Sequence, residues 1–163
     1  MSVTDELVAA NESFAASFSG GGLPGPPSRH VAVVACMDAR LDVYRVLGLG
    51  DGEAHVIRNA GGVVTDDVLR SLTISQRKLG TTEVVLLHHS KCGMATFDDD
   101  EFVAELAADA GQPPTWAPGA FSDTEQDVRE SLALVRACPF LPHTDAVRGF
   151  VYDVDSGALT EVA

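Results

Sequence analysis

Two apolar runs constrain the fold more than any other feature of this sequence. They are VAVVAC, residues 31–36, and EVVLLHH, residues 83–89, whose centre is VVLL. A strand with one face in water alternates apolar and polar residues, whereas a strand covered on both faces of a parallel sheet reads as a continuous apolar run. Both segments therefore predict buried strands of a parallel sheet.

The segments around these runs supply the other elements that such a sheet requires. Helical patterns cover residues 42–49, 65–79, 98–111 and 122–138, and further strands are predicted at 54–62, 146–154 and 158–162. Ser122 and Glu125 have the spacing of a capping box at the start of the last helix. The alternation predicts an α/β fold: a central, mainly parallel β-sheet flanked by helices, with an antiparallel C-terminal edge strand.

The N-terminal segment is predicted to be separate from this sheet. Residues 4–18 have the pattern of a helix, with Thr4 as its expected cap, and residues 19–28, SGGGLPGPPS, have the composition of a linker. The apolar stripe of the helix can dock on its own domain or on a neighbouring subunit. We accordingly divide the chain into an N-terminal helical arm with its linker, residues 1–28, and a single α/β domain, residues 29–163.

The net charge of the chain limits its possible binding partners, and its cysteine count bears on the cellular compartment. The chain has 24 acidic and 11 basic residues and a formal charge of −13, which opposes binding to nucleic acid or to an anionic membrane. No stretch approaches the roughly 20 apolar residues that span a bilayer, and the N-terminus lacks a basic head. Three cysteines are an odd number, which favours reduced thiols. We expect a cytoplasmic protein with a small-molecule substrate.

Three candidate metal ligands follow the buried strands. Cys36 ends the first apolar run, and His89 and Cys92 stand in HxxC spacing at the end of the other. Because sites in open α/β sheets form at the carboxyl ends of the strands, these side chains are predicted to converge. Two thiolates and an imidazole suit zinc, and three protein ligands leave the fourth position open, as in catalytic sites.

Asp38 and Arg40 are the candidate catalytic residues. Alternation along an extended chain sends the side chains of Cys36, Asp38 and Arg40 to one side. The guanidinium can hold the carboxylate ionised and oriented, so that Asp38 accepts a proton from zinc-bound water and the resulting hydroxide is the nucleophile. The same spacing leaves open that Asp38 becomes the fourth zinc ligand and closes the site.

Other residues have more than one interpretation. The stretch RNAG, residues 58–61, either cradles the site through backbone donors or makes a tight turn. His30, His55 and His88 are each possible proton shuttles, although a core histidine is more common at such positions. Cys138 has no visible partner and is predicted to pack in the core.

The motifs CMDAR (36–40), RNAG (58–61) and HSKCG (89–93), taken in this order, resemble those of the β-class carbonic anhydrases, in particular the compact bacterial members. Ser90 and Lys91 stand where many relatives have Thr or Ser followed by Asp. The ligand spacing is therefore preserved, while the local charge differs.

This resemblance implies an enzyme, a carbonic anhydrase, that reversibly hydrates carbon dioxide to bicarbonate. It implies one zinc ion per chain, bound by Cys36, His89 and Cys92, and a dyad of Asp38 and Arg40. Family members also dimerise with an N-terminal helix lying across the partner, which favours a homodimer or higher oligomer here.

Three other functions use the same residues. Relatives within the family hydrolyse carbonyl sulfide or carbon disulfide, which are small linear electrophiles like carbon dioxide. If Asp38 closes the zinc shell, the domain is a non-catalytic, zinc-stabilised interaction module. If Cys36 is itself a covalent nucleophile, activity survives removal of the metal.

Overall fold

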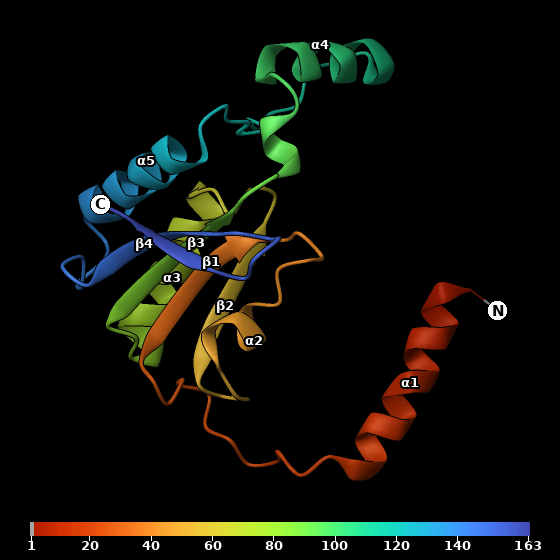
Figure 1. Cartoon of the computed structure of the whole chain (residues 1–163), viewed down its shortest axis with the longest axis vertical. Coiled ribbons are helices and arrows are strands. Elements are labelled where there is room, and N and C mark those ends of the chain that lie inside the picture. The colour runs from red at the N-terminus through yellow and green to blue at the C-terminus, as the bar shows by residue number, and fades with distance from the viewer. Residues whose placement is uncertain (1) are drawn as a thin grey trace.

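The computed structural model describes residues 2–163 as a five-stranded sheet with helices on both faces and two projecting helices (Figure 1). The strands are β1 (Val31–Cys36), β2 (Ala54–Asn59), β3 (Glu83–His89), β4 (Val147–Tyr152) and β5 (Leu159–Val162). The helices are α1 (Val3–Ser17), α2 (Val43–Leu47), α3 (Asp66–Leu79), α4 (Asp99–Ala110) and α5 (Thr124–Ala137), with a 3₁₀ turn η1 (Gly93–Ala95). The predicted α/β class is confirmed.

The strand order brings the ends of β1 and β3 to one edge of the sheet. The order is β2-β1-β3-β4-β5, and neighbouring strands are parallel except for the antiparallel pair β4 and β5. Ala35 of β1 lies opposite Leu87 of β3. Segments that are far apart in the sequence therefore end side by side, as the apolar runs predicted.

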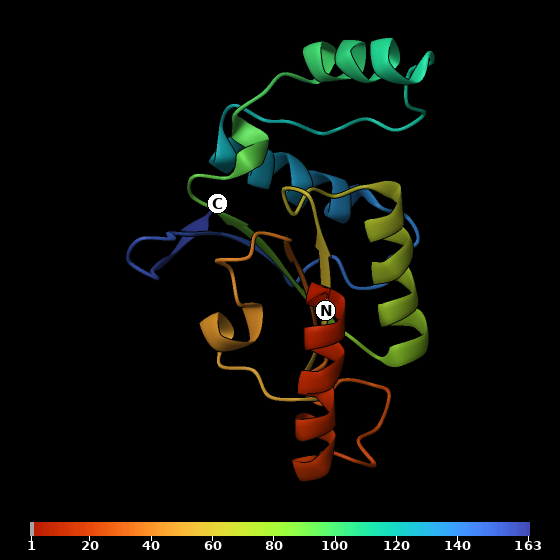
Figure 2. The same ribbon diagram turned by 90° about the vertical axis from the view of Figure 1, so that its right-hand side faces the viewer.

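Apolar cores on both faces of the sheet explain the continuous apolar run of β1. Ala32 and Val34 belong to the core under α3 and α5, whereas Val33 and Ala35 belong to the core that includes α2. Figure 2 shows α2 on one side of the sheet and α3 on the other. All four side chains are at most 1% exposed, and every position of β1 after Val31 is buried, so none of them needs to be polar.

Two predicted helix caps are wrong by one or two residues. Ser2, not Thr4, caps α1: its hydroxyl accepts from the N–H of Asp5 at 3.2 Å, and the Asp5 carboxylate accepts from the N–H of Ser2 at 2.7 Å. Asp123, not Ser122, caps α5 by accepting from two N–H groups of the first turn. A carboxylate also stabilises the positive end of the helix dipole, which favours Asp over the adjacent Ser.

The helices α1 and α4 contribute no buried residue and project from the sheet (Figure 1). Their periodicity and caps identified them as helices, but nothing in these local signals specifies a packing partner. Within residues 2–163, no helix has both the length and the apolar character needed to cross a membrane.

Candidate metal centre

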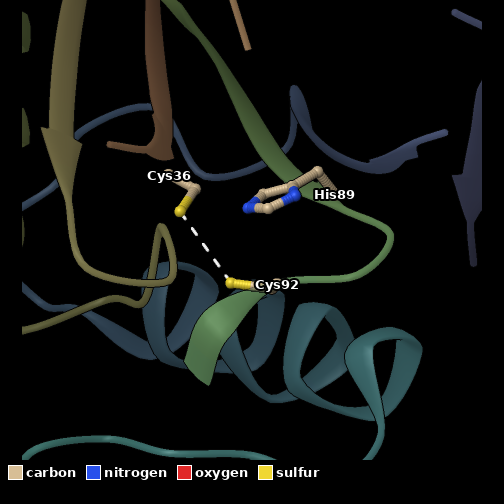
Figure 3. A group of neighbouring side chains, drawn as sticks. All are labelled: Cys36, His89 and Cys92. Carbon is tan, nitrogen blue, oxygen red and sulfur yellow. Dashed lines mark hydrogen bonds between the residues drawn. The ribbon is translucent and has the colours of Figure 1, made fainter. Parts of the chain in front are cut away.

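The three predicted ligands lie together at the carboxyl edge of the sheet. Cys36 is the last residue of β1, His89 is the last residue of β3, and Cys92 immediately precedes η1. Their possible ligand atoms lie within 4.8 Å of one another, and the two Sγ atoms are 3.9 Å apart (Figure 3). All three side chains are at most 4% exposed, so the group is enclosed by protein.

His89 has a ring nitrogen that hydrogen bonding within the described residues leaves unpaired. Its Nδ1 lies 2.9 Å from the carbonyl oxygen of Ser90, which can only accept, so Nδ1 carries the proton. Nε2 is buried without a hydrogen-bond partner, and the ring points toward the two sulfur atoms (Figure 3). A buried unpaired nitrogen is unfavourable unless something binds it. An imidazole lone pair facing two thiols fits a zinc ion.

The two thiols have opposite protonation preferences. Burial opposes ionisation of Cys36, but the His89 imidazole and the backbone N–H groups of Asp38 and Gly61 outweigh it and lower the thiol pKa to about 7. Burial raises the pKa of Cys92 to about 11, although the N–H of Met94 opposes this rise. The contact with the Cys36 sulfur raises the pKa of His89.

Arg40 holds Asp38 beside this group. Its Nε and Nη2 donate to the two carboxylate oxygens at 2.9 and 2.8 Å, and its backbone N–H donates at 2.9 Å. These hydrogen bonds hold the pKa of Asp38 well below its usual range, so the carboxylate is ionised. Asp38 Oδ2 also lies 3.7 Å from His89 Nε2. The carboxylate is therefore next to the three candidate ligands but engaged by a guanidinium.

A pocket of about 160 Å³ opens onto the group. It is lined by Cys36, Met37, Asp38, Ala60, Gly61, Cys92, Gly93 and Met94. The lining contains both candidate sulfur ligands and the candidate proton acceptor, so a small substrate in the pocket would contact the reacting groups directly.

Arg58 contributes in a way that the sequence did not reveal. Its Nε donates to the carbonyl of Cys36 at 2.9 Å and its Nη2 to the carbonyl of Asp38 at 2.7 Å. The N–H of Gly61 helps to lower the pKa of the Cys36 thiol. Gly61 also has a φ of +81° and lies in a turn in which the N–H of Gly62 donates to the carbonyl of Asn59 at 3.4 Å. The two interpretations of RNAG therefore both describe part of the local structure. The register of β1 and β2 places these contacts, and a sequence motif does not contain that information.

The three candidate shuttle histidines lie outside this group. His30 Nδ1 contacts the carbonyl of Gly80 at 2.9 Å, and His55 Nδ1 contacts the hydroxyl of Ser75 at 2.7 Å. His88 is fully buried and its Nε2 lies 2.5 Å from a carboxylate oxygen of α5. Each ring is engaged in local structure, but only His88 has the core position considered for it, since His55 is half-buried and His30 is exposed. Cys138 is buried in the core beneath α5, and its predicted packing role is confirmed.

Comparison with known proteins identifies the family of this chain and agrees with its fold. A family model described as carbonic anhydrase matches residues 31–110. Beta-carbonic anhydrase 1 of Mycobacterium tuberculosis is 57% identical over 162 residues, which cover 99% of each chain. The chain therefore belongs to the β-carbonic anhydrase family.

A solved structure and a more distant curated relative extend this result. The crystal structure of carbonic anhydrase from Streptococcus mutans has a TM-score of 0.93 and 44% identity, and the match covers 100% of this chain and 99% of that one. A carbon disulfide hydrolase of Acidithiobacillus thiooxidans is 33% identical over 155 residues, 82% of this chain and 77% of that protein.

Proposed function

We propose that this chain catalyses the reversible hydration of carbon dioxide to bicarbonate, with one zinc ion held by Cys36, His89 and Cys92. The observation that carries the proposal is the buried, unpaired Nε2 of His89 facing two buried sulfur atoms. Zinc bound there would act as a Lewis acid that lowers the pKa of a water molecule in its fourth coordination position. Family membership supports the reaction.

The charge of the ligand set explains why neighbouring residues matter. Two thiolates neutralise a divalent ion, so the acidification of water is weaker than with three neutral imidazoles. Backbone N–H groups near both sulfur atoms draw negative charge away from them: those of Asp38 and Gly61 at Cys36, and that of Met94 at Cys92. These donors favour a more acidic site.

Asp38 and Arg40 have distinct roles in this proposal. Asp38 would accept a hydrogen bond at its ionised carboxylate from the attacking oxygen and orient that oxygen toward the pocket, because the carboxylate is held 3.7 Å from His89 Nε2. Arg40 keeps that carboxylate ionised and engages both of its oxygens, which opposes its entry into the metal shell. This pairing favours the open site over the closed one.

The proposal is tested by metal analysis and stopped-flow measurement of carbon dioxide hydration. We expect one zinc ion per wild-type chain. Cys36→Ser should lose the zinc and on the order of 10³-fold or more in rate, because the Lewis acid contributes several kcal/mol. Cys138→Ser removes a buried thiol outside the group and should keep both metal and rate. A wild-type chain without zinc, or full activity in Cys36→Ser, would contradict the proposal.

Carbon disulfide hydrolysis is a second candidate, favoured by the 33% identity to the Acidithiobacillus enzyme. The residues would act in the same way on this linear substrate. Release of hydrogen sulfide from carbon disulfide, measured beside carbon dioxide hydration on one preparation, distinguishes the two. Greater identity and coverage favour carbon dioxide.

We further propose that α1 makes the chain a homodimer or a higher homo-oligomer. Leu7, Val8 and Phe14 of this helix are 59–67% exposed, although they are large and apolar. A second copy would bury them, so residues 1–28 act as an arm and residues 29–163 as the catalytic domain. Three free, buried cysteines support a reducing compartment such as the cytoplasm.

A further inference from the structure

The short loop between His89 and Cys92 adopts an unfavourable backbone conformation. Lys91 has a φ of 54°, in the left-handed region, where a side chain with a Cβ is disfavoured. Such a conformation persists when the surrounding contacts over-determine it, and it occurs often at functional sites. The contacts of this loop are therefore informative about how the candidate ligands are held.

Three contacts attach the loop to the hairpin that joins β4 and β5. The N–H of Ser90 donates to the carbonyl of Tyr152 at 2.8 Å, and the hydroxyl of Ser90 accepts from the N–H of Val154 at 3.0 Å. The ammonium of Lys91 donates to the carboxylate of Asp155 at 2.5 Å. Both residues between the candidate ligands thus contact the same hairpin.

The loop also contacts the catalytic groups on its other side. The carbonyl of Ser90 accepts from Nδ1 of His89 at 2.9 Å, which leaves Nε2 free to face the sulfur atoms. The carbonyl of Lys91 accepts from Nη2 of Arg40 at 2.9 Å. A shift of Ser90 or Lys91 would therefore change the position of the imidazole or of the guanidinium that holds Asp38.

The hairpin turn is well suited to act as a support because it is closed by its own hydrogen bonds. Asp153 Oδ1 accepts from the N–H of Asp155 at 3.0 Å, from the N–H of Ser156 at 2.7 Å and from the Ser156 hydroxyl at 2.9 Å. The N–H of Gly157 donates to the carbonyl of Asp153 at 2.8 Å. These bonds fix the turn independently of the candidate ligands.

We propose that the turn of residues 153–158 braces the loop between His89 and Cys92, and that Ser90 and Asp155 are positioning residues for the metal group. The inference rests on the proposed zinc site. A tetrahedral ion needs its ligands in one arrangement, and partners that hold the ligands in place change metal affinity 10- to 100-fold. Ser90 is the stronger brace, because the pair of Lys91 and Asp155 is solvent-exposed and such pairs contribute little.

Zinc release into an excess of chelator tests the brace without reference to activity. Ser90→Ala leaves the N–H of Val154 without its acceptor and should release zinc at least about 10-fold faster than wild type. Ser90→Thr keeps a hydroxyl and should restore slow release. Asp155→Ala should accelerate release measurably, by about 2- to 3-fold. The absorption spectrum of the cobalt(II)-loaded Ser90→Ala protein should shift, because displaced ligands alter the ligand field.

Ser156→Ala is the matched control. It removes a hydroxyl from the same turn, but that hydroxyl contacts only Asp153 and Ala158. Its zinc release should equal that of wild type, because the N–H groups of Asp155, Ser156 and Gly157 still close the turn on Asp153. The Tm of each metal-free variant is measured in parallel, and faster release at an unchanged Tm supports positioning rather than a general loss of stability.

The outcomes separate this inference from the proposed function. If wild type holds zinc and Ser90→Ala releases it at the wild-type rate, the brace is wrong and the proposed function stands. Equally fast release from Ser156→Ala would also overturn the assignment to Ser90. If Ser90→Ala does not fold, Asp155→Ala still decides the matter, because wild-type release and an unchanged cobalt spectrum would overturn the brace. A wild-type chain that takes up no zinc overturns both.

Discussion

The side chains at the carboxyl edge of the sheet are buried by contacts within the chain, whereas those of helix α1 are exposed. At the sheet edge, Cys36, His89 and Cys92 are at most 4% exposed, and contacts within the chain position each of them. On α1, by contrast, no residue is buried, and Phe14 is 59% exposed. The candidate metal centre is thus specified by one chain, whereas α1 carries apolar surface that only another surface can bury.

This difference predicts that small changes at the sheet edge have large effects, whereas changes on α1 affect assembly alone. The projecting helix α4 resembles α1, because it also contributes no buried residue. It is nevertheless tied to its own chain, since the Asp99 carboxylate accepts from the N–H groups of Gly119 and Ala120 at 3.1 and 2.7 Å. Helix α1 is therefore the better candidate for contact with a second copy.

The largest effect is expected from Asp38→Asn. This change keeps the shape of the side chain but removes the negative charge that orients the attacking oxygen, so the hydration rate should fall about 10²- to 10³-fold while zinc is retained. A stopped-flow assay measures the hydration rate, and metal analysis of the same preparation measures the zinc content. Asp67→Asn is the control, because Asp67 pairs with Arg70 at 2.8 Å on an exposed face of α3. An unchanged rate in Asp38→Asn would remove Asp38 from the mechanism.

A matched pair of glycines compares packing in the two regions. A Cβ on Gly62 would lie 2.8 Å from the backbone nitrogen of Cys36, at a φ of +76°. Gly62→Ala should therefore lower the free energy of unfolding by roughly 2–4 kcal/mol, from overpacking and backbone strain. A Cβ on Gly25, in the linker after α1, would meet nothing within 4 Å. Gly25→Ala should be neutral or slightly stabilising in urea unfolding. If both substitutions changed the free energy of unfolding by the same amount, the sheet edge would not be more tightly packed than the linker.

Substitution on α1 should weaken association and leave the metal centre intact. Burying a Phe side chain contributes about 1.5–3 kcal/mol, so Phe14→Asn should raise the dimer dissociation constant about 10- to 100-fold. Sedimentation velocity over a concentration series measures this constant, and zinc content should not change. Glu12→Gln alters the same helix without removing apolar surface and serves as the control. If Phe14→Asn associates like wild type, α1 is not the intersubunit arm.

The sequence predicted most of the sheet and the meeting of the candidate ligands for a clear physical reason. The run at 31–36 is apolar throughout because both faces of β1 are covered, and parallel neighbours end at the same edge. Those two facts bring Cys36 near His89 without any further information.

What the sequence did not predict depends on register and on turns. The contacts of Arg58 with two carbonyl groups follow from how β2 aligns with β1, and the contact of Ser90 with Val154 follows from how the β4–β5 hairpin closes. The caps Ser2 and Asp123 were missed because neighbouring residues are also good caps, and backbone geometry selects between them. Local sequence patterns do not specify the strand register, the closure of the hairpin or which of two adjacent residues caps a helix.

The effect that is smallest per step is a change of zinc affinity with pH, about 10-fold per pH unit, which should come from the thiols at the sheet edge alone. Zinc binds thiolates, so protons compete with it and its affinity falls as the pH falls. Cys92, with a pKa of about 11, carries a proton at neutral pH, which predicts about 10-fold weaker binding per pH unit lowered. Below about 7 the thiol of Cys36 is also protonated, and the slope should become steeper. Competition with a chromophoric chelator from pH 6 to 9 measures this slope, which Cys138→Ser should share. A pH-independent affinity would contradict two thiolate ligands.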